Sequence, residues 1–204
     1  MLKHVRVFAL VAAALLAACD STQPSGEIRT GVGPQLDVYD PPIEVEVLQR
    51  TTPLDRDYSA SAVIGRGGGT ISIPQAGFSI TFPSNAIKGQ PTTVTVTATA
   101  GGNVAYLFEP HGLVFHNAPV ITQDLRGTEV FQEPALRSTL EGAYFPDPTD
   151  LQGATARIRE TRPTVVDVSG WKMKFNVQHF SGYLASARRG GYISSSGNYI
   201  PVER

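Results

Sequence analysis

TVTVTATA, residues 93–100, alternates strictly between threonine and a small apolar residue. Successive side chains of a β-strand point to opposite faces, so this stretch predicts a strand with one buried aliphatic face and one threonine face. The same period of two recurs over residues 58–64 and 78–82. No stretch carries a clear helical stripe, and only residues 133–143 are compatible with one short helix. The sequence therefore predicts an all-β sandwich.

Further strands are expected where short apolar runs lie between turn residues. Residues 43–47, IEVEV, predict a short edge strand. Residues 65–69, GRGGG, predict a tight strand-to-strand turn rather than a phosphate cradle, because Thr70 stands where a dinucleotide fingerprint requires glycine. The remaining expected strands lie near residues 104–108, 113–115, 119–125, 155–159, 164–168 and 171–179.

The first eighteen residues have the pattern of a signal peptide. Lys3 and Arg6 precede the apolar run VFALVAAALLAA, residues 7–18, which is shorter than the ~20 residues that span a bilayer. The run ends in LAAC, residues 16–19, which resembles the lipobox of bacterial lipoproteins. That resemblance implies cleavage between Ala18 and Cys19 and acylation of Cys19, for example by palmitate. The alternatives are a plain secretory peptide that ends in cysteine and an uncleaved anchor.

Cys19 is the only cysteine of the chain, which excludes disulfides and cysteine-based metal sites from the rest of it. We expect a protein of the bacterial cell envelope, held on a membrane by its N-terminal lipid, with the inner or outer membrane left open. The expected parts are a signal peptide (1–18), a lipidated N-terminus and tether with one short strand (19–57), the sandwich (58–187) and a loose C-terminal tail (188–204).

Five blocks of glycine, proline and apolar residues follow one another between residues 64 and 125: Gly68 to Ile71, Pro74 to Pro83, Ala86-Ile87, Pro110 to Phe115 and Pro119-Val120. Through these blocks, residues 64–125 resemble the ZU-five domain, named for zonula occludens and uncoordinated-five proteins. Asn85 departs from the glycine usual in that family, but asparagine tolerates a left-handed backbone better than most residues. The resemblance implies a β-sandwich that mainly contacts other protein modules.

His179, Phe180 and Ser181 form a His-Phe-Ser triplet, at which some ZU-five proteins cleave their own chain. The resemblance implies an N-to-O acyl shift: Ser181 attacks the Phe180 carbonyl, His179 takes the hydroxyl proton, and water opens the ester.

Strand geometry sets a condition on this chemistry. Side chains two positions apart in a flat strand lie roughly 6.6 Å apart along the chain, beyond the ~2.6–3.2 Å that proton transfer needs. Cleavage therefore requires a kink. The apolar parity shifts between Val177 and Phe180, and Gly182 follows, which indicates such a kink. The alternative is that the triplet only closes the sandwich.

The charge balance and histidine spacing predict neither a nucleic-acid partner nor a cofactor. The formal net charge is −1, without a basic excess or stripe. The histidines that follow Cys19 are His111, His116 and His179, and their spacing is not that of a metal ligand pair. Residues 146–150, PDPTD, lack the alternating carboxylates of a calcium loop. No metal site is therefore predicted.

The expected function is that of a non-enzymatic interaction or structural module with an unidentified envelope protein as partner. Self-processing between Phe180 and Ser181 is the alternative, and fold resemblance alone does not convey that activity. A glycan-binding surface is the third hypothesis, and it requires an aromatic groove. Trp171, the lone tryptophan, is expected in the core.

Overall fold

The computed structural model describes residues 43–187 and, for the backbone only, residues 191–193 and 199–201. All of them lie in the unit Asp40–Arg204. Their strands are arranged in antiparallel sheets and their helices are short, which confirms the predicted all-β sandwich. The helical turns are α1 (Glu129–Gln132) and the 3-10 helices η1 (Pro74–Ala76), η2 (Pro134–Thr139) and η3 (Pro148–Asp150).

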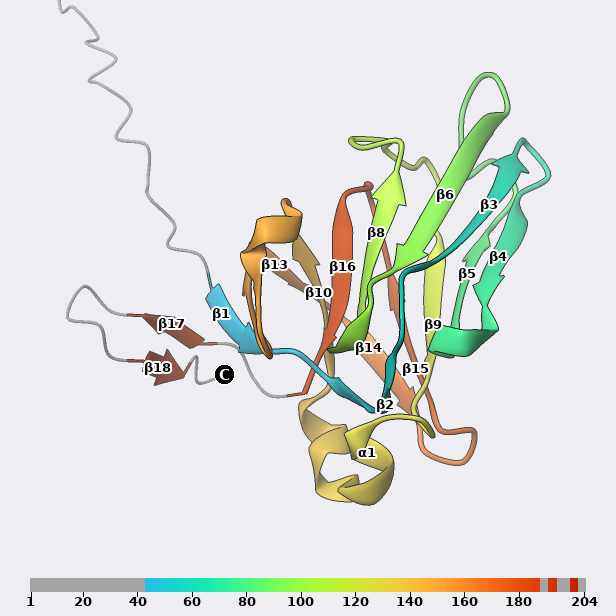
Figure 1. The fold of residues 1–204 in the computed structure, drawn as a ribbon. Helices are drawn as coiled ribbons and strands as arrows, with labels where there is room; N and C mark the ends of the chain where they lie inside the picture. The colour runs from blue at the N-terminus through green and yellow to red at the C-terminus, as the bar shows by residue number, and fades with distance from the viewer. Residues whose placement is uncertain (1–42, 188–190, 194–198, 202–204) are drawn as a thin grey trace, which may run out of the picture. The chain divides into compact units, whose positions relative to one another are not determined.

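Two sheets form the sandwich (Figure 1). The six-stranded sheet has the order β13 (Glu160–Arg162), β10 (Glu141–Phe145), β16 (Gly182–Ser186), β8 (Ala105–Glu109), β6 (Thr92–Ala98) and β3 (Tyr58–Ile64). The five-stranded sheet has the order β14 (Thr164–Asp167), β15 (Lys172–Asn176), β9 (Val120–Asp124), β5 (Phe78–Phe82) and β4 (Gly69–Ile73).

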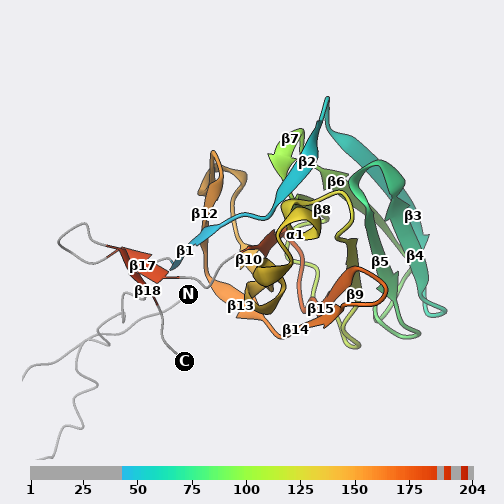
Figure 2. The ribbon, with the colours of Figure 1, turned by 90° about the horizontal axis from the view of Figure 1, so that it is seen from below.

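A third sheet covers part of the outer face of the six-stranded sheet. Its order is β11 (Leu151–Gln152), β12 (Thr155–Ile158), β1 (Ile43–Glu46), β17 (Gly191–Ile193) and β18 (Tyr199–Pro201). Val45 and Ile158 of this sheet share a buried cluster with Phe145 and Leu184 of the six-stranded sheet. A short ribbon of β2 (Gln49–Leu54) and β7 (Gly101–Asn103) lies at one end of the sandwich (Figure 2).

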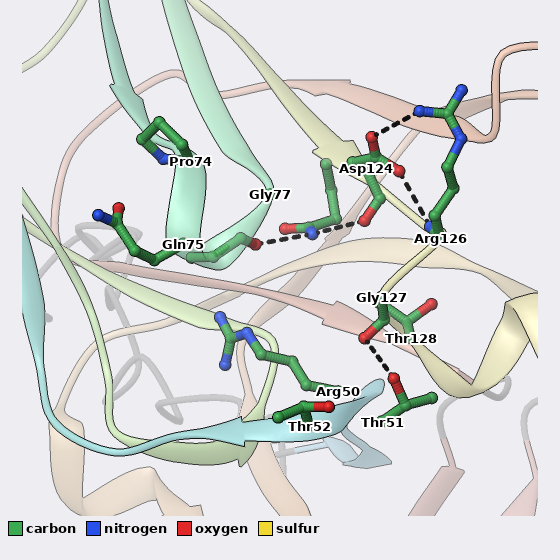
Figure 3. Close-up of a pocket in the computed structure, with 12 residues that line it drawn as sticks. Arg50, Thr51, Thr52, Pro74, Gln75, Gly77, Asp124, Arg126, Gly127 and Thr128 are labelled. Carbon is green, nitrogen blue, oxygen red and sulfur yellow. Dashed lines mark hydrogen bonds and ion pairs between the residues drawn. The ribbon is translucent and has the colours of Figure 1, made fainter.

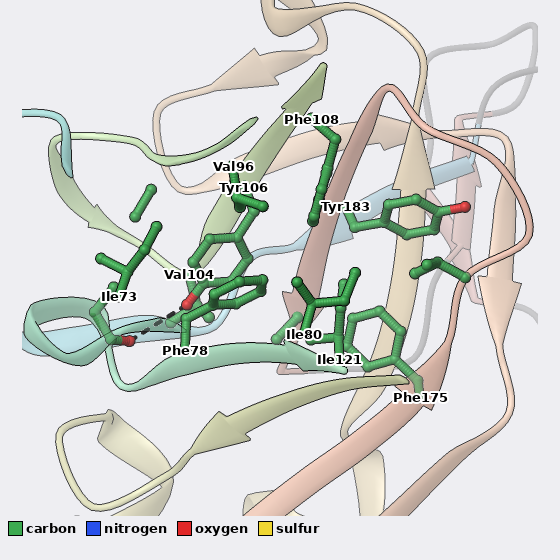
Figure 4. Packing of buried hydrophobic residues seen from close by; sticks show 14 of the residues in the cluster. Ile73, Phe78, Ile80, Val96, Val104, Tyr106, Phe108, Ile121, Phe175 and Tyr183 are labelled. Carbon is green, nitrogen blue, oxygen red and sulfur yellow. Dashed lines mark hydrogen bonds between the residues drawn. The ribbon is translucent and has the colours of Figure 1, made fainter. Parts of the chain in front are cut away.

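The threonine-rich stretch forms β6, as its alternation predicts. Val94, Val96 and Ala98 are fully buried, while hydroxyl pairs link the outer faces of β3 and β6, with Ser59 and Thr97 oxygens 2.8 Å apart. The inner faces of the two sandwich sheets share one aromatic and aliphatic core (Figure 4). The rings of Phe78 and Tyr106 lie 4.1 Å apart there and bridge the two sheets.

The turn chemistry also agrees with the sequence. The GRGGG run forms the tight turn that carries the chain from β3 in the six-stranded sheet to β4 in the five-stranded sheet, with the Gly68 N–H donating to the Gly65 carbonyl at 3.1 Å. Gly68 has φ 77°, and a Cβ there would lie 2.2 Å from the Phe82 carbonyl oxygen. Asn85 has φ 58°, the left-handed conformation expected of it.

Two local expectations are wrong, the edge position of residues 43–47 and the strand at 113–115, and two others, the short helix within 133–143 and the strand within 171–179, hold over shorter ranges. Residues 43–46 are not an edge strand, because β1 pairs with β12 on one side and β17 on the other. The helical turns occupy 129–132 and 134–139, and residues 141–145 are a strand. Residues 113–115 contribute only an isolated bridge, between Val114 and His179. The strand expected over 171–179 is β15, Lys172–Asn176, preceded by Trp171 in a left-handed turn with φ 51°.

Candidate functional site

The His-Phe-Ser triplet lies where the chain crosses from one sandwich sheet to the other. β15 of the five-stranded sheet ends at Asn176, and β16 of the six-stranded sheet begins at Gly182. The parity shift in the sequence therefore marks a real break between two strands. The connection is held by residues 112–115: the Phe180 N–H donates to the Leu113 carbonyl at 2.9 Å, and the Gly112 N–H donates to the Phe180 carbonyl at 2.9 Å.

Phe180 is a core residue. Its side chain is fully buried. Its ring stacks on Phe108 at 4.8 Å between centroids and meets Phe115 edge-on at 4.7 Å. Offset and edge-on aromatic pairs of this kind add to the stability that burial provides. Phe180 therefore fixes the position of the two polar residues on either side of it.

His179 is turned toward the β13 side of the sheet. Its Nε2 lies 3.1 Å from Glu160 Oε1, and its ring meets Tyr144 edge-on at 4.4 Å. The Tyr183 hydroxyl donates to the His179 carbonyl at 2.9 Å. His179 and Ser181 are both among the described residues, and no hydrogen bond joins their side chains. The crossing does not bring the predicted base to the hydroxyl.

Ser181 lies at the edge of the core, 9 % exposed. Its Oγ donates to the Phe180 carbonyl oxygen at 2.7 Å. Two further groups approach the same Oγ at 3.4 Å, the Tyr144 hydroxyl and the His111 Nδ1. The Gly112 N–H thus holds the Phe180 carbonyl, and the imidazole close to the Ser181 hydroxyl is that of His111.

This geometry places a hydroxyl, an imidazole and a backbone donor around one peptide carbonyl. A backbone N–H directed at a carbonyl oxygen is the kind of donor that stabilises a developing oxyanion. The distance of 3.4 Å from His111 Nδ1 to Ser181 Oγ is somewhat longer than the ~2.6–3.2 Å at which a base accepts a proton.

Sequence reasoning did not bring His111, Gly112 and Tyr144 to this site. His111 is 70 positions from Ser181, and Tyr144 is 37. The pairing of β16 with both β8 and β10 brings them together. The sequence does contain the Pro-His-Gly turn, residues 110–112. This turn points to the site only if the strand that pairs with β16 is already known.

The carboxylates of Asp147 and Asp167 each hold a turn and do not form a common site. Asp147 accepts from the Thr149 N–H at 2.8 Å, which lowers the pKa of its carboxyl. Asp167 accepts from the Gly170 N–H at 2.9 Å and the Ser169 hydroxyl at 2.8 Å, and these two bonds lower its pKa. Over residues 43–187 no three His, Cys, Asp or Glu side chains gather in a cluster that could hold a metal ion.

Ala18 and Cys19, the predicted cleavage and lipidation residues, lie outside the described residues. Within the described part of the chain, no helix is long and apolar enough to span a membrane.

Trp171 is half-buried rather than deep in the core: its ring meets Phe131 at 4.6 Å, and the Arg137 guanidinium lies 4.0 Å from its centroid.

Neither a scan against protein-family models nor a search of curated proteins finds a match to this chain.

Proposed function

We propose that this chain is a lipid-anchored protein of the bacterial cell envelope whose β-sandwich is a non-enzymatic interaction module. The anchor is Cys19, from the lipobox resemblance. The ZU-five resemblance supports an interaction role, because domains of that family mainly contact other protein modules. The partner is another envelope protein.

The observation that carries the interaction role is the edge strand β3. It spans seven residues, YSASAVI, and among the described strands it pairs only with β6. Edge strands usually carry a charge, a proline or a bulge that prevents pairing with other chains. β3 has no charged residue or proline, and its register with β6 is unbroken from Tyr58 to Ile64. Such an edge suits a partner that adds a strand.

A site-specific photocrosslinker tests this role in the envelope of the expressing bacterium. We expect adducts with another protein from position 61 on β3 and none from position 138, since Ser61 and Ser138 are both exposed serines but Ser138 lies in η2. Ser61→Lys should reduce the adducts formed from position 59, because a lysine on an edge opposes strand addition. Equal adducts from positions 61 and 138 would contradict the proposal.

The anchor is tested separately. Cys19→Ser should release the protein from the membrane fraction and abolish incorporation of a palmitate analogue. A variant that stays membrane-bound and labelled would contradict the assignment of Cys19.

Self-processing is the second candidate, favoured by the surroundings of the Phe180 carbonyl. Ser181 Oγ would attack that carbon, the Phe180–Ser181 C–N bond would break, and the Ser181 nitrogen would leave as an amine after taking a proton. Water would then open the ester, giving a Phe180 carboxylate and regenerating the hydroxyl. The Gly112 N–H faces the carbonyl oxygen, and the imidazole nearest Oγ is that of His111.

Denaturing intact-mass analysis of the full-length chain separates the two candidates. The interaction module predicts that every chain observed extends to Arg204, with no cleavage after Phe180. Self-processing predicts a fragment ending at Phe180, which Ser181→Ala abolishes. His111→Gln and His179→Gln then identify the base: the geometry favours loss of cleavage in the first and retention in the second.

The glycan-binding hypothesis has the least support. The Arg137 guanidinium already lies against the ring of Trp171, and Phe131 meets it edge-on. A sugar stacks on an open aromatic face, and this one is occupied.

A further inference from the structure

A buried arginine without a carboxylate partner lies at one end of the sandwich. Arg50 on β2 is 7 % exposed, and no carboxylate of the described residues forms an ion pair with it. Arg162 on β13, with a side chain 10 % exposed, does pair with a carboxylate, that of Glu160. Burying a charge is costly unless it is paired. Arg50 is therefore a cation whose counter-ion is missing from the described chain.

The hydrogen bonds of Arg50 are also incomplete. A guanidinium carries five N–H donors. One terminal nitrogen of Arg50 donates to the Asn103 carbonyl, the other donates to the Tyr106 hydroxyl at 3.4 Å, and Nε has no partner. Tyr106 cannot serve as the counter-ion, because burial raises its pKa to about 12 and the phenol stays neutral at physiological pH. The Tyr106 hydroxyl instead donates to Gln123 Oε1.

Arg50 forms part of the wall of a pocket (Figure 3). The cavity measures about 310 Å³. In Figure 3 the Arg50 guanidinium lies between the β2 strand and the turn of η1, which faces it across the cavity. The remaining walls come from β2, the end of β9 and the loop between β9 and α1. The lining residues are Arg50, Thr51, Thr52, Pro74 to Gly77, Gln123, Asp124 and Arg126 to Thr128.

We propose that this pocket binds a small monocarboxylate whose carboxylate pairs with Arg50. The planar guanidinium matches a carboxylate in a two-bond arrangement. The charged side chains of the lining are Arg50, Arg126 and Asp124, which leaves a surplus of one positive charge, so a monoanion balances it. Asp124 already accepts from Arg126 at 3.3 Å. The cavity lies at the small end of the ~300–1,000 Å³ usual for ligand pockets.

The test is an NMR titration of the purified full-length chain with sodium acetate. Acetate is a small monocarboxylate that carries a single methyl group. Sodium chloride replaces acetate at constant ionic strength in the reference titration. We expect the Arg50 Nε–H signal to shift saturably with acetate in the millimolar range and to change little with chloride. Inorganic phosphate, titrated in the same way, should bind more weakly because Asp124 opposes a second negative charge.

Two variants keep the proposal falsifiable. Arg50→Lys retains the charge but loses the planar fork, and the acetate affinity should fall by about tenfold or more. In case that variant does not fold, Gln75→Glu adds a carboxylate to an exposed position in the pocket lining and should weaken acetate binding roughly twofold to fivefold. Gln90→Glu, the same change at an exposed residue outside the lining, is the matched control and should leave the affinity unchanged.

Three results would overturn the proposal. They are a shift of the Arg50 signal that does not saturate, an equal response to chloride and acetate, and saturable binding of phosphate without binding of acetate. Equal weakening by Gln75→Glu and Gln90→Glu would also overturn it, because the effect would then reflect net charge rather than this pocket.

Discussion

Gly182→Ala should destabilise the sandwich through a clash with Phe145. Gly182 on β16 lies directly opposite Phe145 on β10. A Cβ at position 182 would lie 2.4 Å from two ring atoms of Phe145, and that ring is fully buried. Ordinary carbon contacts are ~3.5–4.0 Å, so the ring would have to move by about 1 Å within a packed cluster.

The expected loss follows from two opposing effects. Overpacking a well-filled core costs roughly 1–3 kcal/mol. Replacing glycine by alanine in a strand raises the free energy of unfolding by about 0.5–1 kcal/mol, because alanine loses less backbone freedom on folding. The two ranges together allow a loss of about 0–2.5 kcal/mol. Because the contact would be as short as 2.4 Å, we expect the free energy of unfolding to fall by about 1–2 kcal/mol, roughly a fivefold to thirtyfold change in the ratio of folded to unfolded protein. Urea unfolding of the full-length chain measures it.

A double-mutant cycle with Phe145→Leu tests the cause. The smaller side chain makes room for the methyl group that Gly182→Ala introduces, so the double variant should be more stable than the sum of the single losses predicts. Gly67→Ala is the control, because a Cβ at position 67 meets nothing within 4 Å. Additivity of the two changes to within about 0.5 kcal/mol would refute the steric reasoning.

The remaining predictions concern single residues. Phe180→Ala should lower the free energy of unfolding by about 3–5 kcal/mol in urea titrations, because it empties a fully buried aromatic site; a loss below about 1 kcal/mol would contradict the packing described. The pKa of Tyr106 is raised to about 12, so its contribution to stability is complete below its ordinary value of 10.0 and is lost as the pH rises through about 12. Alkaline absorbance titration should show a late tyrosine ionisation that is lost in Tyr106→Phe, while the raised pKa of Tyr183 leaves a second delayed tyrosine in both proteins. The pKa of Asp167 is lowered from 3.8 by bonds from Gly170 and Ser169, so its turn is fully stabilised above pH 3.8 and loses that contribution as the pH falls through the lowered value. Carboxyl NMR should place the Asp167 midpoint below 3.8, and a midpoint at or above it would count against the two bonds.

The sandwich was predictable where a strand buries one face and exposes the other. β6 and β5 follow the period of two, because their outer faces meet water and carry threonine or serine. β16 was not anticipated, because all five of its residues are buried. Tyr183 and Leu184 are adjacent in sequence but pack into two different clusters, one on each face of the sheet. Such a strand has no alternation of buried and exposed residues to detect. The third sheet, which covers its second face, includes segments of the C-terminal tail.

Only the order of the site residues along the chain was predictable from the sequence. The order His-Phe-Ser and the parity shift indicated a break before β16, and the structure has one. The direction of His179 toward Glu160 depends on β13, which pairs with β10 and with neither of the strands that flank the triplet, β15 and β16. Likewise, the approach of His111 to Ser181 depends on the register of β8 against β16. Such pairings are long-range and are not encoded in the spacing of a local motif.

The central position of β1 in its sheet has a mechanical consequence. Residues before Ile43 join the described domain through β1, which is paired at four positions with β12 and at two with β17. A load arriving along the chain from the N-terminal side therefore cannot peel away a single free strand. It must open two ladders together, and one of them is formed with β17, which lies near the C-terminal side of the described residues. Tension on the N-terminal side is thus resisted in part by a strand that is distant from β1 in the sequence.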